Sequence, residues 1–176
     1  MEISLEMIKE LRQLTSAGIN DCKKVLTETK GDMKKALELL RQKGLEIAAK
    51  KAERIALQGR IESYVHNGNK IGVIVEVNCE TDFVAKNEEF MRFCKDLCMQ
   101  VAATAPRFLK KEDVPTDTIK DLPDKELFYK ETCLLEQPFI KDATVKINDL
   151  LTNLIAKTGE NIIIRRFVRF GVGEKI

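Results

Sequence analysis

The sequence predicts an α+β fold: a small N-terminal bundle of three helices, a helical linker, then an antiparallel sheet with helices packed on one face. Apolar residues recur at helical spacing through the first 44 residues, with glycines between the runs. From residue 59 the pattern changes to the alternation and β-branched residues of strands. Strand character returns at residues 161–170, so this last segment should pair with the earlier strands.

Each of the three N-terminal helices has its own apolar stripe, which should face the interior of the bundle. The inward residues are expected to be Leu5, Met7, Ile8, Leu11 and Leu14 in the first helix, Cys22, Val25 and Leu26 in the second, and Ala36, Leu37, Leu39 and Leu40 in the third. A bundle of this size buries little surface and would be marginally stable alone.

Glycines and short polar residues predict where these helices begin and end. Gly18, Gly31 and Gly44 are expected to close them, because glycine readily adopts the positive φ of a helix C-terminus. Asn20 and Asp32 can cap the second and third helices. The Ala-rich, basic segment that follows predicts a helical linker, giving domains at 1–44 and 59–176 joined by residues 45–58.

The second domain is expected to open with a hairpin. Ile61, Ser63 and Val65 alternate with Glu62, Tyr64 and His66, and Asn67-Gly68-Asn69 is a strong turn signal. The β-branched run at residues 71–77 predicts a well-buried strand.

Three helices are expected between this hairpin and the last strand. The first is capped by Asn87 and buries Phe90, Phe93, Cys94, Leu97, Cys98 and Val101. The others are expected at residues 124–136 and 144–157, the latter closed by Gly159. The charged stretch 110–125, which contains two prolines, predicts a surface connection.

Composition narrows the class of protein. The 176 residues are 44% hydrophobic and 33% charged, and they contain no apolar run long enough to span a membrane. The N-terminus lacks the features of a signal or transit peptide, so a cytoplasmic location is expected. A net charge of +2 argues against direct nucleic-acid binding. The five cysteines, an odd number, are expected to be free thiols.

Signals for catalysis are weak. His66 is the single histidine and lies beside a turn, and no phosphate-binding loop or nucleophile elbow is present. Cys94 and Cys98, spaced i and i+4, are too few for a zinc site. A thiol enzyme using Cys79 remains an alternative, although the acidic neighbour Glu80 should raise the pKa of that thiol. No cofactor and no enzymatic activity are expected.

Lysine pairs on the N-terminal helices allow two interpretations. Lys23-Lys24, Lys34-Lys35 and Lys50-Lys51 could form a nucleic-acid surface, but interspersed acidic residues favour a solvated helix face. A non-catalytic helical binding module for nucleic acid or ubiquitin-like partners is therefore kept as an alternative.

The segment Thr81-Asp82-Phe83-Val84 leaves a buried strand and precedes a capped helix. A lone Phe in such a loop is usually tucked into the core of its own domain. In the other interpretation Phe83 points outward beside a carboxylate, which suits insertion into the groove of a partner. The residue pattern alone favours the buried Phe83 and keeps the outward one as the alternative.

Ordered matches along nearly the whole chain resemble the elongation factor Ts family. They comprise Leu11-Arg12, Ala17-Gly18, Asp21-Cys22-Lys23-Lys24-Val25-Leu26, Gly31-Asp32, residues 40–44, Ala48-Ala49-Lys50-Lys51, residues 75–86, Gln137-Pro138-Phe139-Ile140 and residues 164–174. The string at residues 75–86 is similar to the most distinctive string of the family.

The resemblance implies a ubiquitin-associated (UBA)-like three-helix domain and a dimerisation-type core. It also implies a partner, the GTPase elongation factor Tu, from which the protein would release GDP and Mg²⁺ so that GTP can bind. Thr81, Asp82, Phe83 and Val84 would form the exchange loop near the Mg²⁺ site. Leu11, Cys22, Lys23 and Val25 would belong to the domain that contacts the GTPase domain.

Two departures from the family pattern matter. Longer members carry two related core modules and this chain has room for one, which implies a homodimer and a 2:2 complex. Many members also have a His at the position occupied here by Gln100, so a contact made by that His does not transfer to this chain.

Overall fold

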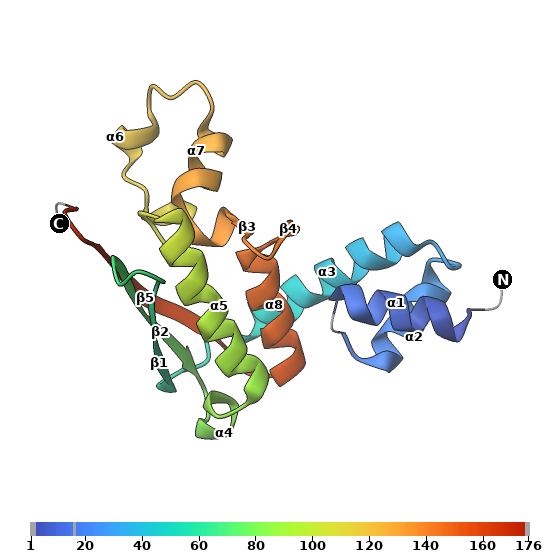
Figure 1. Ribbon diagram of the computed structural model, residues 1–176. Coiled ribbons are helices and arrows are strands. Elements are labelled where there is room, and N and C mark those ends of the chain that lie inside the picture. Colours follow the sequence, from blue (N-terminus) through green and yellow to red (C-terminus); the bar gives the residue numbers. More distant parts are fainter. Residues whose placement is uncertain (1–2, 16, 175–176) are drawn as a thin grey trace. The chain divides into compact units, whose positions relative to one another are not determined.

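The computed structural model describes residues 3–15 and 17–174, and it confirms the α+β class (Figure 1). The chain divides into two compact units. The first comprises Met1–Ile55 and Leu151–Asn161, and the second comprises Ala56–Leu150 and Ile162–Ile176. The chain therefore returns to the first unit shortly before its last strand.

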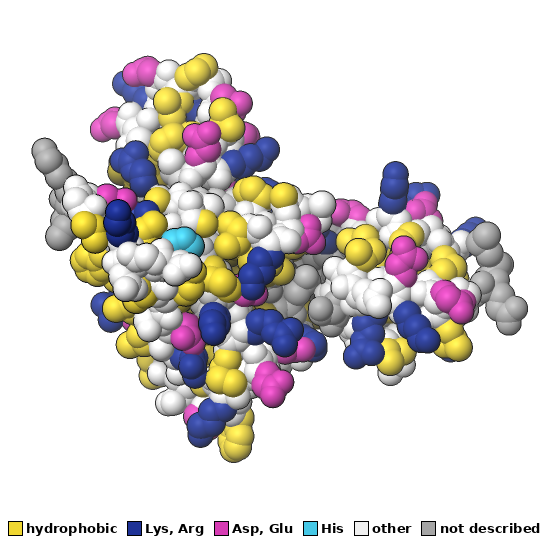
Figure 2. Space-filling model, viewed as in Figure 1, with side chains coloured by type: hydrophobic (Ala, Val, Ile, Leu, Met, Phe, Trp, Pro, Cys, Tyr) yellow, Lys and Arg dark blue, Asp and Glu magenta, His cyan; other side chains and the backbone are white. Residues whose placement is uncertain are grey.

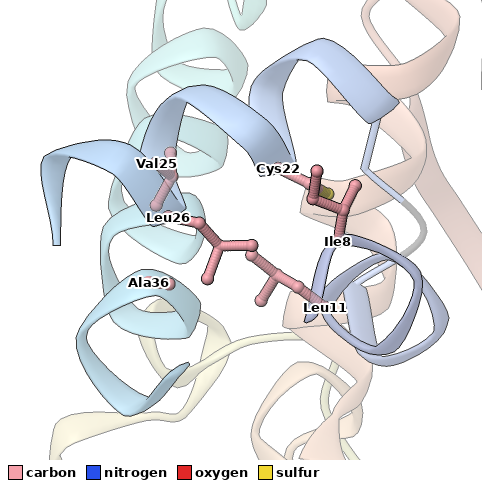
Figure 3. Packing of buried hydrophobic residues seen from close by; sticks show 6 residues of the cluster. All are labelled: Ile8, Leu11, Cys22, Val25, Leu26 and Ala36. Atoms are coloured by element: carbon pink, nitrogen blue, oxygen red, sulfur yellow. The ribbon is translucent and has the colours of Figure 1, made fainter. Parts of the chain in front are cut away.

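Three helices form the N-terminal part of the first unit: α1 (Leu5–Thr15), α2 (Ile19–Glu28) and α3 (Met33–Lys51). Figure 3 shows the side chains that meet between them, which are Ile8, Leu11, Cys22, Val25, Leu26 and Ala36. The helical spacing predicted all six. Leu5, Leu14 and Leu37, expected to face inward, are exposed instead.

The predicted helix boundaries are partly wrong. Gly18 has φ −61° and precedes the first residue of α2, so it does not close α1, and Asn20 lies inside α2 rather than capping it. Gly31, with φ +83°, and Asp32, whose carboxylate accepts from the Lys35 N–H at 3.1 Å, are confirmed as the turn and the cap before α3. Gly44 is the largest error, because α3 continues through it.

A close approach between two segments explains Gly44. A Cβ at this position would lie 3.2 Å from Cγ2 of Thr152, so glycine provides space for a neighbouring segment. Beyond it, Lys51 donates a hydrogen bond to the carbonyl of Gly159, and Asn161 donates to the carbonyl of Arg54 at 2.7 Å. These bonds attach the end of α3 to the segment before the last strand.

The second unit contains an antiparallel sheet of three strands: β1 (Gln58–Val65), β2 (Ile71–Cys79) and β5 (Ile163–Gly171). Their order is β1-β2-β5, so β2 is central. The hairpin turn between β1 and β2 has positive φ at Gly68 and Asn69, as the Asn-Gly signal predicted. The last strand pairs with β2, which confirms the expected sheet.

The two faces of the sheet differ in burial. In β2, alternate side chains are buried, namely Val73, Val75, Val77 and Cys79. Helix α5 (Glu88–Thr104) packs on β1 and β2, and the six apolar residues predicted for its inner face are all buried. On the opposite side lies a set of exposed apolar residues, the outward sheet face, formed by Ile61, Val65, Ile74, Val168 and Phe170.

The connection after α5 has more structure than expected. It contains η1 (Lys111–Asp113), α6 (Thr116–Ile119), α7 (Lys125–Thr132) and η2 (Leu134–Glu136), so the helix expected at 124–136 is divided. A hairpin of β3 (Pro138–Phe139) and β4 (Asp142–Lys146), which the sequence did not predict, follows. Because β4 occupies residues 142–146, α8 begins later than expected, at Ile147–Thr158.

Gln100 joins this hairpin to α5. Its side chain is fully buried, and its amide nitrogen donates to Oε1 of Gln137 and to the carbonyl of Pro138, both at 3.1 Å. Its amide oxygen accepts from the Ile140 N–H at 2.9 Å. Gln100 is therefore an internal link between α5 and the hairpin.

We predict that Gly59→Ala destabilises the sheet. Gly59 has φ +149°, and a Cβ there would lie 2.2 Å from the carbonyl oxygen of Val77. The free energy of unfolding should fall by about 1–3 kcal/mol, measured by urea denaturation followed by circular dichroism. Gly72→Ala is the matched control in the same sheet, since its Cβ would meet nothing within 4 Å. Equal effects of the two substitutions would contradict this account.

Candidate functional site

The loop singled out in the sequence lies between β2 and α5, the two most buried elements of the second unit (Figure 1). Asp82–Ala85 form a single helical turn, α4, and Thr81 precedes it. Both ends of the loop are therefore attached to packed structure.

Side-chain and backbone bonds close the turn. The hydroxyl of Thr81 accepts from the Val84 N–H at 3.4 Å, and the buried thiol of Cys79 donates to the Thr81 carbonyl at 3.1 Å. Asn87 donates its N–H to the Val84 carbonyl at 3.0 Å, and its side chain caps α5 by accepting from the Glu89 N–H at 2.8 Å. The end of one helical element thus leads directly into the start of the next.

Phe83 points away from the domain interior. Its side chain is 82% exposed, the highest value among the large apolar residues that the structure describes. The interpretation that placed Phe83 in the core is therefore wrong. The helical turn explains why: Val84 and Ala85 are the partly buried members of α4, and this leaves residues 82 and 83 on the outer side.

Asp82 is adjacent to this ring and is paired. Its carboxylate accepts from Nζ of Lys86 at 2.7 Å, across the turn. The hydrogen bond from Lys86 is the main reason that the pKa of Asp82 is lowered, with the positive charge of Lys86 adding to it. Asp82 is therefore a carboxylate at neutral pH.

The four residues implied for partner binding in the first unit lie in two different environments. Leu11, Cys22 and Val25 are fully buried inside the bundle, whereas Lys23 is exposed. Three of the four thus build the interior, and burial raises the pKa of the Cys22 thiol.

Two exposed apolar residues that the sequence reasoning did not assign to a surface lie near the turn between α1 and α2. Leu14 is 56% exposed and Ile19 is 55% exposed. Helical spacing accounts for the exposure of Leu14, because the buried series Ile8, Leu11 and Thr15 leaves Leu14 on the neighbouring face of α1.

The structure gives no support to thiol or metal chemistry in residues 3–15 and 17–174. All five cysteines are buried and free, and burial is the main cause that raises the pKa of Cys94 and of Cys98 to about 12. Within these residues no group of three or more His, Cys, Asp or Glu side chains could hold a metal ion. The exposed His66 ring is hydrogen-bonded to the hydroxyl of Tyr64 at 2.9 Å.

Charged residues are mixed on the surface. On the face shown in Figure 2, Lys and Arg side chains are interspersed with Asp and Glu and do not gather into one basic patch. This distribution is typical of a solvated surface. None of the helices described is long and apolar enough to cross a membrane.

Comparisons with known proteins agree over most of the chain. A family model described as "Elongation factor TS" matches residues 2–125. Among curated proteins, elongation factor Ts of Carboxydothermus hydrogenoformans is 52% identical over 195 aligned positions, which cover 98% of this chain and 90% of the relative. Elongation factor Ts of Thermoanaerobacter pseudethanolicus is 49% identical over 197 positions, covering 99% and 97%.

We predict that no thiol of the folded protein reacts rapidly. Reaction with a disulfide reagent such as Ellman's requires an accessible thiolate, and every cysteine side chain is buried. At pH 8 the native protein should release colour much more slowly than N-acetylcysteine at the same thiol concentration. After denaturation all five cysteines should react. One thiol reacting as fast as the free amino acid would restore the thiol-enzyme hypothesis.

Proposed function

This chain belongs to the elongation factor Ts family and is a translation elongation factor, and we propose that it is the guanine-nucleotide exchange factor for elongation factor Tu. The observation that carries the proposal is the exposed Phe83 on a capped turn between two buried elements. A large apolar side chain held in solvent on an ordered turn is suited to insertion into a partner.

The proposed activity depends on a difference in affinity for two states of the GTPase. An exchange factor must bind the nucleotide-free GTPase more tightly than the GDP-bound form, and GDP must then weaken binding of the factor by the same ratio. No covalent bond in either protein is made or broken, so the chain needs neither a cofactor nor a catalytic residue. Such a factor acts in the cytoplasm, where translation elongation takes place.

The exchange loop supplies the part that discriminates between these states. Phe83 wedges between helices of the partner, and Thr81, Asp82 and Val84 hold it at the required angle. The displaced helices disturb the groups that coordinate Mg²⁺, and GDP, whose phosphates depend on that ion, then leaves. GTP binds to the vacated site and lowers the affinity for the factor.

The domain at residues 1–44 provides affinity for the GTPase. Lys23 is the accessible member of the four residues named for this role, and Leu14 and Ile19 add exposed apolar surface on the same bundle. Leu11, Cys22 and Val25 act from the interior by keeping α1 and α2 in place. Residues 45–58 then connect this UBA-like domain to the core at 59–176.

A second copy of the chain covers the outward sheet face. Ile61, Val65, Ile74, Val168 and Phe170 form an apolar surface on a three-stranded sheet, with the Glu76–Arg166 ion pair beside them at 2.7 Å. Two identical faces related by a two-fold axis would bury each other. The resulting homodimer would bind two GTPase molecules in a 2:2 complex.

We predict that Phe83→Ala slows GDP release from elongation factor Tu at least tenfold, because removing a central apolar anchor typically costs about 2 kcal/mol. Stopped-flow fluorescence of a labelled GDP measures the rate, and titration of the nucleotide-free GTPase measures affinity. Leu127→Ala, which truncates an exposed leucine on α7, is the control and should leave the rate unchanged. An unchanged rate for Phe83→Ala with intact binding would remove the wedge from the mechanism.

We also predict that the protein is a dimer at micromolar concentration and that Phe170→Asp converts it to a monomer. A carboxylate on the outward sheet face would be buried without a partner, at a cost of several kcal/mol. Analytical ultracentrifugation measures the mass, and Leu127→Asp serves as a control away from the sheet. A wild-type protein that sediments strictly as a monomer would overturn the dimer.

A further inference from the structure

The direction of the Phe83 ring depends on the α4 turn alone. Because the side chain is 82% exposed, the core of the domain does not hold the ring by packing. The backbone of residues 82–85 therefore decides where it points. A helix of four residues is far too short to be stable by itself, since nucleation is costly and few bonds follow. The contacts that close this turn consequently determine how the ring is presented.

Lys86 makes two hydrogen bonds to Asp82, and both close the α4 turn. Its backbone N–H donates to the carbonyl of Asp82 at 3.2 Å, which is the helical bond of the turn. Its ammonium group donates to the carboxylate of Asp82 at 2.7 Å, an i,i+4 ion pair with the acid on the N-terminal side. This is the favourable orientation for such a pair on a helix. Phe83 lies between the two residues that are joined.

The local sequence gives Lys86 no substitute. Between residues 71 and 91 it is the only basic residue, and the same stretch carries Glu76, Glu80, Asp82, Glu88 and Glu89. Among the positions three and four residues from Asp82, which are Asn78, Cys79, Ala85 and Lys86, only Lys86 carries a charge that can pair with its carboxylate. Without Lys86 the turn would lose this ion pair.

We propose that Lys86 is a positioning residue for the exchange loop, and that Asp82 orients Phe83 by pairing with Lys86 rather than by offering a free charge to the partner. The inference rests on the exchange function proposed above, and it assigns a role within that function to each of the two charged residues. An exposed pair of this kind changes the population of a turn by about twofold. Its effect is therefore to tune the exchange rate.

The test is a double-mutant cycle on GDP release from elongation factor Tu, measured by stopped flow. Lys86→Met keeps a long, unbranched side chain and removes the charge, so it should slow release about twofold, whereas Lys86→Arg should retain the wild-type rate. Asp82→Asn should slow release in the wild-type background and have a clearly smaller effect in the Lys86→Met background. If Asp82 instead acts on the partner directly, its effect will be the same in both backgrounds, and the proposal fails.

A second measurement tests whether the ion pair stabilises the turn in the free protein. Amide hydrogen exchange at Val84 and Lys86 should accelerate about twofold in Lys86→Met, with an unchanged global unfolding midpoint and with recovery in Lys86→Arg. Unchanged protection of these amides would reject the positioning role. If protection falls as expected while Phe83→Ala still releases GDP at the wild-type rate, the pair positions the ring as proposed and the exchange function of the loop is what fails.

Discussion

The packing of α5 on the central strand β2 is the interaction on which the second unit depends. Val73, Val75, Val77 and Cys79 form one side of this contact, and the apolar stripe of α5 forms the other. The burial of these apolar side chains supplies most of the free energy that holds sheet and helix together. The two elements are consecutive major elements in the chain, so the segment that joins them has both of its ends fixed. A short loop between rigid ends can present a large side chain to solvent without losing its own shape.

The same constraint explains why the sequence predicted the sheet, α5 and the position of the loop, but not the orientation of Phe83. Alternation in β2 and helical spacing in α5 are strong signals because each reflects one buried face. The orientation of one side chain in a four-residue turn has no such periodic signal. It depends on whether the turn is helical, and bonds from Thr81, Lys86 and Asn87 decide this. The family resemblance implied an outward-facing Phe83, whereas the usual behaviour of a lone Phe in a loop favoured a buried one.

The remaining errors in the sequence prediction come from contacts with residues far away in the sequence. Gly44 was expected to stop a helix, yet it lies within α3, where it leaves space for Thr152, a residue more than one hundred positions later. The hairpin of β3 and β4 is short and is held by the side chain of a distant helix residue, Gln100. Neither cause can be seen in a window of neighbouring residues. Three of the four residues implied for partner contact in the bundle, Leu11, Cys22 and Val25, are buried as their helical spacing predicted, because motif residues can serve the scaffold as well as the surface.

The choice of glutamine at position 100 has a consequence for proton binding. The family resemblance implies a histidine at this position in many relatives, and an imidazole in a closed interior gains or loses a proton between about pH 5 and 8 depending on its neighbours. The amide of Gln100 satisfies two acceptors and one donor with no ionisable group. The attachment of the hairpin to α5 is therefore not linked to proton uptake at this residue. In this chain, the hydrogen bonds of Gln100 that join α5 to the hairpin do not change with cellular pH through titration of residue 100.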